Sequence, residues 1–190
     1  MLNRPPREWS TFQYLDPKKI LLGLRDIQLN YPLNELSYQA ASLRTRELRQ
    51  FGEGRQAALF CYGMSIALET DVHFAQVERQ DYDIIARIID KNEAHFVPVQ
   101  LKEWVPDFLP DAKDLQSELD KLSKYADSGD LVVAFHLNRT CHIQFDSLSL
   151  PENIAELWFF GAKDQTQSHW ILIGNLLSKS VRTYEFEYPA

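Results

Sequence analysis

Two strand-like segments between residues 81 and 104 constrain the fold of this chain more than any other part of its sequence. The first, DYDIIARIID, is rich in isoleucine, and the second, HFVPVQLKEW, alternates apolar residues with other side chains. Both patterns are typical of β-strands. Gln100 and Lys102 are two residues apart, so a strand places them on the same face. Because a buried polar group costs free energy unless it has a partner, this face is predicted to be solvated or to form a functional site.

The segments around this pair predict an α/β fold. Apolar residues at helical spacing predict helices over 34–52, 53–69 and about 111–127, the last with Asp111 as its N-cap, and a short helix near 18–27. Further strands are expected at 72–78, 130–137, 142–145, 156–162, 169–174 and 182–188. A helix, an antiparallel meander and a helix that returns to a buried strand predict a sandwich with a central mixed sheet flanked by helices.

Length and composition predict one domain. The chain has 190 residues, of which 45% are hydrophobic, and this is enough for a single core. We expect an N-terminal extension and helix at 1–50, a core at 53–137 and a strand-rich tail at 138–190. The sequence contains no run of eighteen apolar residues and starts with no apolar leader, so neither a membrane span nor a signal peptide is predicted. With two cysteines and no zinc pattern, a cytoplasmic protein is expected.

The charge is distributed unevenly along the chain. The net charge of −7 argues against general nucleic-acid binding. Through Arg55, however, nine Lys and Arg residues face six Asp and Glu residues. Four arginines gather around one predicted helix start, namely Arg44, Arg46, Arg49 and Arg55. As a group they are predicted to follow a phosphate backbone, although for any one of these arginines a solvated helix face is the favoured interpretation.

Three sequence features in the predicted core resemble the PD-(D/E)XK nuclease superfamily, which has the restriction-endonuclease-like fold. They are Glu53 on a helix, DYDIIAR at the start of one strand, and VQLK in the next strand. In that family an early helix supplies a glutamate, an aspartate opens a core strand, and the following strand carries (E/D)xK. Asp83 matches the aspartate, and Gln100 and Lys102 replace the acid and the lysine. The resemblance covers about residues 53–137.

The resemblance implies a magnesium-dependent endonuclease that hydrolyses phosphodiester bonds in DNA, or in RNA. Asp83, the side chain of Gln100 and the backbone carbonyl of Leu101 would bind Mg²⁺, with Mn²⁺ as a substitute. Lys102 would assist the attacking water or stabilise the transition state. Glu53 would complete the acidic set. Many nucleases of this fold cut as homodimers, so a homodimer is a further expectation, and no membrane partner is expected.

Gln100 is the departure from the family pattern, because an amide oxygen binds magnesium more weakly than a carboxylate does. Two alternatives therefore stand beside the nuclease. One is a catalytically inactive module of the same fold that binds nucleic acid or a partner protein. The other is a plain interaction protein that works through its acidic surface and its aromatic tail. In that case Gln100 and Lys102 lie on an exposed strand face and Asp83 ends a turn.

Other acidic residues near these motifs have alternative roles. Glu47 and Glu69 are alternatives to Glu53, which is preferred because it shares one helical face with Ala57, Phe60 and Met64. Glu78 and Asp81 are either supporting groups behind Asp83 or loop acids. Glu103 points to the other face of its strand and is predicted to be solvated.

Overall fold

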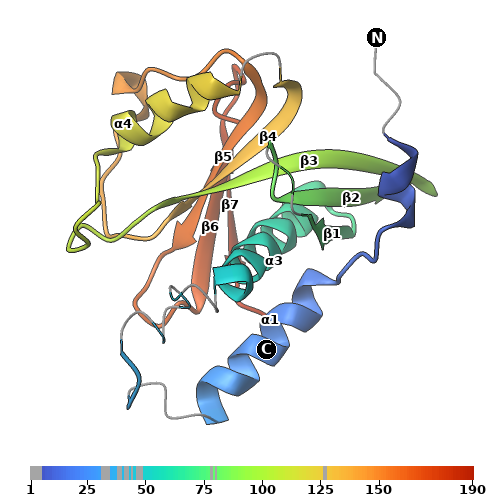
Figure 1. The fold of residues 1–190 in the computed structure, drawn as a ribbon, viewed down its shortest axis with the longest axis horizontal. Helices are drawn as coiled ribbons and strands as arrows, with labels where there is room; N and C mark the ends of the chain where they lie inside the picture. Colours follow the sequence, from blue (N-terminus) through green and yellow to red (C-terminus); the bar gives the residue numbers. More distant parts are fainter. Residues whose placement is uncertain are drawn as a thin grey trace.

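The computed structural model describes residues 6–30, 35–37, 40, 43, 45, 49–77, 79, 81–125 and 128–190. In this part of the chain a seven-stranded sheet lies at the centre (Figure 1). Its strands, side by side in sequence order, are β1 (Val72–Gln76), β2 (Ile84–Asp90), β3 (Glu93–Trp104), β4 (Ser128–Leu137), β5 (Ile154–Ala162), β6 (His169–Gly174) and β7 (Arg182–Glu187). The helices are η1 (Arg7–Thr11), α1 (Pro17–Asn30), α3 (Arg49–Leu68), α4 (Leu115–Asp120), η3 (Lys121–Lys124) and η4 (Phe145–Ser147), where η marks a 3₁₀ helix.

The sheet is mixed, with a parallel centre between two antiparallel ribbons. β1, β2 and β3 form one antiparallel meander, and β5, β6 and β7 form another. β4 lies between them and runs parallel to both β3 and β5. Parallel neighbours need a crossover connection, and α4 with η3 forms the crossover from β3 to β4. The predicted α/β class with a mixed sheet is therefore confirmed, and the strand-rich tail extends the same sheet.

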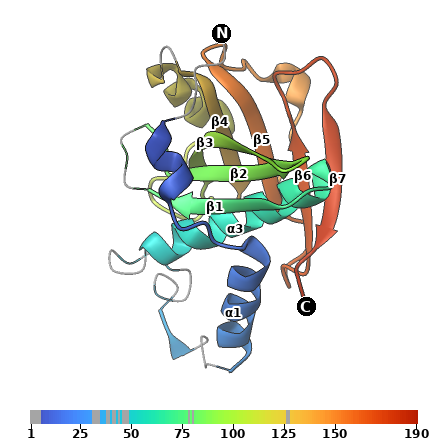
Figure 2. The ribbon, with the colours of Figure 1, turned by 90° about the vertical axis from the view of Figure 1, so that its right-hand side faces the viewer.

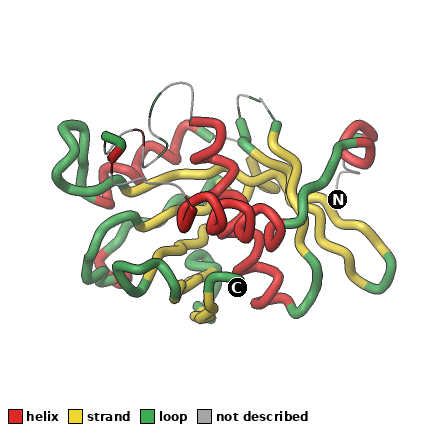
Figure 3. The backbone as a smooth tube through the Cα atoms, turned by 90° about the horizontal axis from the view of Figure 1, so that it is seen from below, coloured by secondary structure: helices red, strands yellow, loops and turns green. Residues whose placement is uncertain are grey.

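Helix α3 covers one face of the sheet, and α4 covers the other. Phe60 of α3 and Val99 of β3 belong to one hydrophobic cluster, whereas Leu119 of α4 and Val133 of β4 belong to a second. Figure 2 shows α3 running across the curled sheet, and Figure 3 shows strands curving to both sides of the central helices. Each face of the sheet therefore has its own apolar core.

Strand periodicity decides which side chains reach which core. Val99 and Leu101 of β3 pack with α3. Since neighbouring residues of a strand point to opposite faces, Gln100 and Lys102 lie on the face that α4 covers. β4 is buried on both faces, and this explains its uninterrupted apolar run at 131–135.

The N-terminal segment adds to one edge of the sheet. Leu15 forms an isolated antiparallel bridge with Phe74 of β1, with N–H···O distances of 2.7 and 3.1 Å. Trp9 of η1 packs edge-on against Tyr82, with 5.9 Å between ring centres. The N-terminal segment therefore contacts both the outer strand and the loop that leads into β2.

Several local predictions are wrong. Residues 142–145 form no strand, because β4 and β5 pair directly with each other and leave that segment outside the sheet. The helix predicted over 111–127 is α4 followed by η3. It begins after Asp114 rather than Asp111, because a carboxylate oxygen of Asp114 accepts the backbone N–H of Ser117 at 2.9 Å.

Two other helices differ from their predicted bounds. α1 is longer than the predicted helix near 18–27. About half of the helix predicted over 34–52 lies outside the described residues, and α3 begins at Arg49. No helix in the described ranges is long and apolar enough to cross a membrane.

Candidate functional site

Asp83 and Gln100 meet on the face of the sheet that α4 covers. Asp83 directly precedes β2, whose first residue, Ile84, pairs with Val99 of β3. One carboxylate oxygen of Asp83, Oδ2, accepts hydrogen bonds from Gln100 Nε2 and from the backbone N–H of Leu101, the latter at 2.7 Å. Gln100 is only 5% exposed. The side chain of Gln100 in β3 is therefore buried and hydrogen-bonded, as a buried polar group requires.

The oxygen atoms around this amide suit a hard cation. Gln100 Nε2 also donates to the carbonyl oxygen of Leu101 at 3.2 Å, so the carboxylate of Asp83 and this carbonyl converge on one point. Mg²⁺ prefers such oxygen ligands. In this structure the amide presents its nitrogen to that point. Gln100 would have to turn its oxygen inward to become a ligand.

Carboxylates are few at this point. In the described part of the chain, no three His, Cys, Asp or Glu side chains are grouped so that they could hold a metal ion. A cation beside Asp83 would therefore depend on the carbonyl of Leu101 and on the amide oxygen of Gln100. These two oxygens are neutral, so we expect weaker magnesium binding here than in a site with two carboxylates.

Tyr125, at the end of η3, completes the polar contacts of Gln100. Its hydroxyl donates to Gln100 Oε1 at 2.9 Å, and the residue is 6% exposed. Burial raises the pKa of Tyr125 to about 12, and the negative charges of Asp83 and Asp81 add to the rise. Tyr125 therefore stays protonated at neutral pH. The sequence motifs do not point to Tyr125, although a tyrosine three residues after Leu122, at helical spacing, signals a hydroxyl that needs a partner when it is buried.

Lys102 lies close to the same tyrosine. Its Nζ is 5.7 Å from the centre of the Tyr125 ring, and Nζ of Lys124 is 5.0 Å from that centre. Both ammonium groups are within reach of a cation–π contact. The structure thus brings Asp83, Gln100 and Lys102 together around Tyr125.

Glu53 lies on α3, which packs on the opposite face of the sheet. The N-terminal turns of α3 nevertheless reach the end of the sheet where Asp83 lies. Gln76 of β1 pairs with Ile84, and its Nε2 donates to the carbonyl of Gln50 at 3.1 Å. Glu53 is therefore near this end of the sheet, on the other side from the amide of Gln100. Of the alternatives to Glu53, Glu47 is outside the described residues, and Glu69 follows the far end of α3.

Glu103 is not solvated as predicted. It is partly buried under α3, where its carboxylate accepts hydrogen bonds from Asn138 Nδ2 at 2.6 Å and from Gln56 Nε2 at 3.4 Å. α3 reaches over this end of β3, which the sequence pattern alone does not reveal. Of the two acids near Asp83, Asp81 is exposed, and Glu78 lies outside the described residues.

The predicted arginine face is described only at Arg55. Arg44 and Arg46 lie outside the described residues, and of Arg49 only the backbone is described. The guanidinium of Arg55 donates to Gln167 Oε1 and lies 5.7 Å from the ring centre of Trp170. Burial lowers the pKa of Arg55. Arg55 is thus engaged in internal contacts, which leaves it poorly placed to follow a phosphate backbone.

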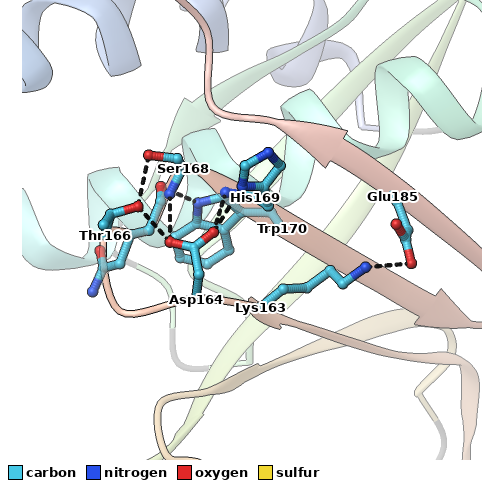
Figure 4. A network of polar contacts seen from close by, with 8 residues as sticks. Lys163, Asp164, Thr166, Ser168, His169, Trp170 and Glu185 are labelled. Carbon is cyan, nitrogen blue, oxygen red and sulfur yellow. Dashed lines mark hydrogen bonds and ion pairs between the residues drawn. The ribbon is translucent and has the colours of Figure 1, made fainter.

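The turn between β5 and β6 supplies the partner of Arg55. Figure 4 shows the polar contacts of Asp164 in this turn. Asp164 accepts hydrogen bonds from the hydroxyl of Thr166, from the backbone of Ser168, and from both the backbone N–H and Nδ1 of His169. The hydroxyl of Thr166 contributes most to lowering the pKa of Asp164, and the bond from His169 adds to it. The carboxylate therefore fixes the turn that carries Gln167.

Removing this carboxylate should destabilise the protein in a pH-dependent way. Because the pKa of Asp164 is lower in the folded state, its contribution is complete above the unfolded value, about 3.9, and is lost as the pH falls through the folded value. Asp164→Asn should therefore unfold at a lower temperature than wild type at pH 7. The difference should shrink in acid below about pH 4. Thermal unfolding from pH 7 to pH 2 measures this, with the exposed Glu152→Gln as control. Equal midpoints at pH 7 would contradict it.

Comparison of the chain with protein-family models, with curated proteins and with solved structures finds no match. The geometry around Gln100 and the resemblance in its motifs are therefore the grounds on which a function can be proposed.

Proposed function

We propose that this protein is a magnesium-dependent endonuclease that hydrolyses phosphodiester bonds in DNA. One observation carries the proposal, namely the convergence of the Asp83 carboxylate and the Leu101 carbonyl on the amide of Gln100. Lys102 lies on the same face of β3, two residues further along the strand. A carboxylate and neutral oxygens can hold Mg²⁺, and a lysine beside the ion can stabilise the charge that develops on the phosphate.

The order of the elements supports a restriction-endonuclease-like fold. Helix α3 precedes the meander of β1, β2 and β3, and α4 then leads into β4, which lies parallel to β3. This is the order of helix, strands, returning helix and buried strand on which the resemblance rests. Asp83 directly precedes the second strand, and Gln100 and Lys102 lie in the third.

Each residue would have a separate task in hydrolysis. Asp83, the carbonyl of Leu101 and the oxygen of Gln100 would hold Mg²⁺. When bound, the ion would neutralise charge on the scissile phosphate and lower the pKa of a water molecule. The ammonium group of Lys102 would stabilise the negative charge that develops on the phosphate. Lys124, whose ammonium group also lies near the ring of Tyr125, would add positive charge where the DNA backbone approaches.

A second candidate function is a catalytically inactive module of the same fold that binds nucleic acid. The orientation of the Gln100 amide favours it, because Nε2 of Gln100 donates a hydrogen bond to the carboxylate of Asp83. The amide thus stands where the resembled family has a second carboxylate. A direct N–H···O contact satisfies Asp83 without a cation. Such a module would bind DNA with a strong salt dependence and would not cut it.

The test is cleavage of supercoiled, linear and single-stranded DNA in Mg²⁺, in Mn²⁺ and in EDTA. Wild type should cut at least one form when the metal is present, and Asp83→Asn should cut about 10²–10³-fold more slowly, as when one stabilising group is removed. Asp81→Asn removes the same charge from the same loop, and we expect it to cut within about tenfold of wild type, because Asp81 is exposed and supplies no hydrogen bond to the amide.

The outcomes separate the candidates. Salt-dependent DNA binding without cleavage by wild type would favour the inactive module. The absence of both binding and cleavage would leave an interaction protein. Equal cleavage by wild type and Asp83→Asn would place the activity elsewhere in the molecule.

A further inference from the structure

The hydroxyl of Tyr125 holds one end of an amide whose other end faces the proposed cation position. Gln100 Oε1 accepts the hydrogen bond from Tyr125, while Gln100 Nε2 donates to Asp83 and to the carbonyl of Leu101. Gln100 and Tyr125 are both more than nine-tenths buried. Each polar atom of this amide therefore has a protein partner, and water has little access to replace one.

We infer that Tyr125 is a positioning residue that lets the amide of Gln100 rotate by half a turn when a cation binds. This inference rests on the proposed function. A tyrosine hydroxyl both donates and accepts hydrogen bonds. It donates to Oε1 in the orientation seen here, and after rotation it accepts a bond from Nε2. Both orientations therefore keep the outer end of the amide paired.

Electrostatics decides which orientation is stable. Without a cation, an inward Oε1 would face the carboxylate of Asp83 and the carbonyl of Leu101, and the three oxygens would repel one another. The inward Nε2 avoids this repulsion with two hydrogen bonds. A cation reverses the preference, because it attracts all three oxygens. Binding of the ion thus turns Oε1 of Gln100 inward, and the hydroxyl of Tyr125 stays the hydrogen-bond partner of the outer end of the amide.

Removing the hydroxyl should penalise the two orientations unequally. Tyr125→Phe keeps the ring beside Lys102 and Lys124 and removes only the hydrogen-bonding group. In the cation-free orientation it leaves the acceptor Oε1 without its donor. In the rotated orientation it leaves the donor Nε2 buried without an acceptor, and buried unpaired N–H groups are tolerated less often than underused carbonyl oxygens. Tyr125→Phe should therefore bind Mg²⁺ more weakly, by about three- to tenfold.

A double-mutant comparison isolates this effect from ordinary packing. Gln100→Glu places an oxygen at both ends of the group, so rotation changes nothing. We expect Gln100→Glu to bind Mg²⁺ about tenfold more tightly than wild type, because the inward group gains a charge. In the Gln100→Glu background, Tyr125→Phe should change the affinity by less than about twofold. A purely structural role of Tyr125 would weaken binding equally in both backgrounds.

The measurements are calorimetric titration with Mg²⁺ and nuclear magnetic resonance of the side-chain amide of Gln100, identified by its loss in Gln100→Glu. Saturating Mg²⁺ should bring the amide protons of Gln100 close to the ring of Tyr125. Equal weakening in both backgrounds, or amide protons that stay directed at Asp83, would overturn the inference while the cation site remains. If neither wild type nor Gln100→Glu binds Mg²⁺, the inference and the proposed cation site both fail. A cooperative thermal unfolding transition in each variant confirms that the variants are folded.

Discussion

Lys102→Ala is expected to slow DNA cleavage severely and to leave the thermal midpoint of the protein nearly unchanged. The ammonium of Lys102 lies 5.7 Å from the ring centre of Tyr125, on the face where Asp83 and Gln100 meet. In the proposed mechanism it stabilises charge that exists only in the transition state, so its loss should slow cleavage about 10²–10³-fold. Lys102 is only partly buried, and changes at such positions usually alter the free energy of unfolding by about 0.5 kcal/mol.

Single-turnover cleavage and thermal unfolding measure the two effects separately. Lys124→Ala is the matched control, because Lys124 lies beside the same ring at 5.0 Å but belongs to η3 rather than to the strand that carries Gln100. It should weaken DNA binding in a salt-dependent way and leave the rate at saturating DNA close to wild type. Cleavage by Lys102→Ala at the wild-type rate would remove Lys102 from the mechanism.

Trp170→Ala should cause the largest loss of stability among the changes considered. Trp170 is 0% exposed, donates from Nε1 to the carbonyl of Gln167 at 2.8 Å, and stacks against His136 with 5.8 Å between ring centres. Removing a buried tryptophan side chain costs about 3–5 kcal/mol, because it loses apolar burial and leaves a cavity. For a chain of this size the midpoint of thermal unfolding should fall by about 6–20 °C.

Denaturant and thermal unfolding of Trp170→Ala and Trp170→Phe test this expectation. The phenylalanine variant keeps most of the apolar volume and should lose less stability than the alanine variant. Trp104→Ala is the control at a partly buried tryptophan on the face that α4 covers. A loss below about 1 kcal/mol for Trp170→Ala would show that neighbouring side chains collapse into the space.

The sequence predicts the strands of this fold better than its connections. β2, β3 and β4 lie within about three residues of their predicted ends, since a residue period of two and continuous apolar runs are local signals. The meeting of Asp83 and Gln100 follows from the same periodicity once β2 and β3 pair. Residues 142–145 resemble a strand locally, but whether a strand forms depends on a neighbour that lies elsewhere in the sequence.

The contacts that complete the site depend on folding over longer distances. Tyr125 reaches Gln100 only because the crossover through α4 brings its end back over β3. Arg55 carries the same charge as the other arginines in its segment, and the sequence does not show that the turn holding Gln167 would cover it. Local patterns thus locate the donors and acceptors, whereas their partners are set by the crossover and by the packing of α3.

The two outer strands of the sheet have different consequences for self-association. β1 is capped by the bridge from Leu15, whereas β7 pairs with β6 and with no other strand in the described part of the chain. An uncapped outer strand can recruit a second chain through its free backbone groups. β7 carries three exposed charged side chains, Arg182, Glu185 and Glu187, and such charges disfavour pairing between identical strands. These charges thus disfavour the joining of two copies into one continuous sheet through β7.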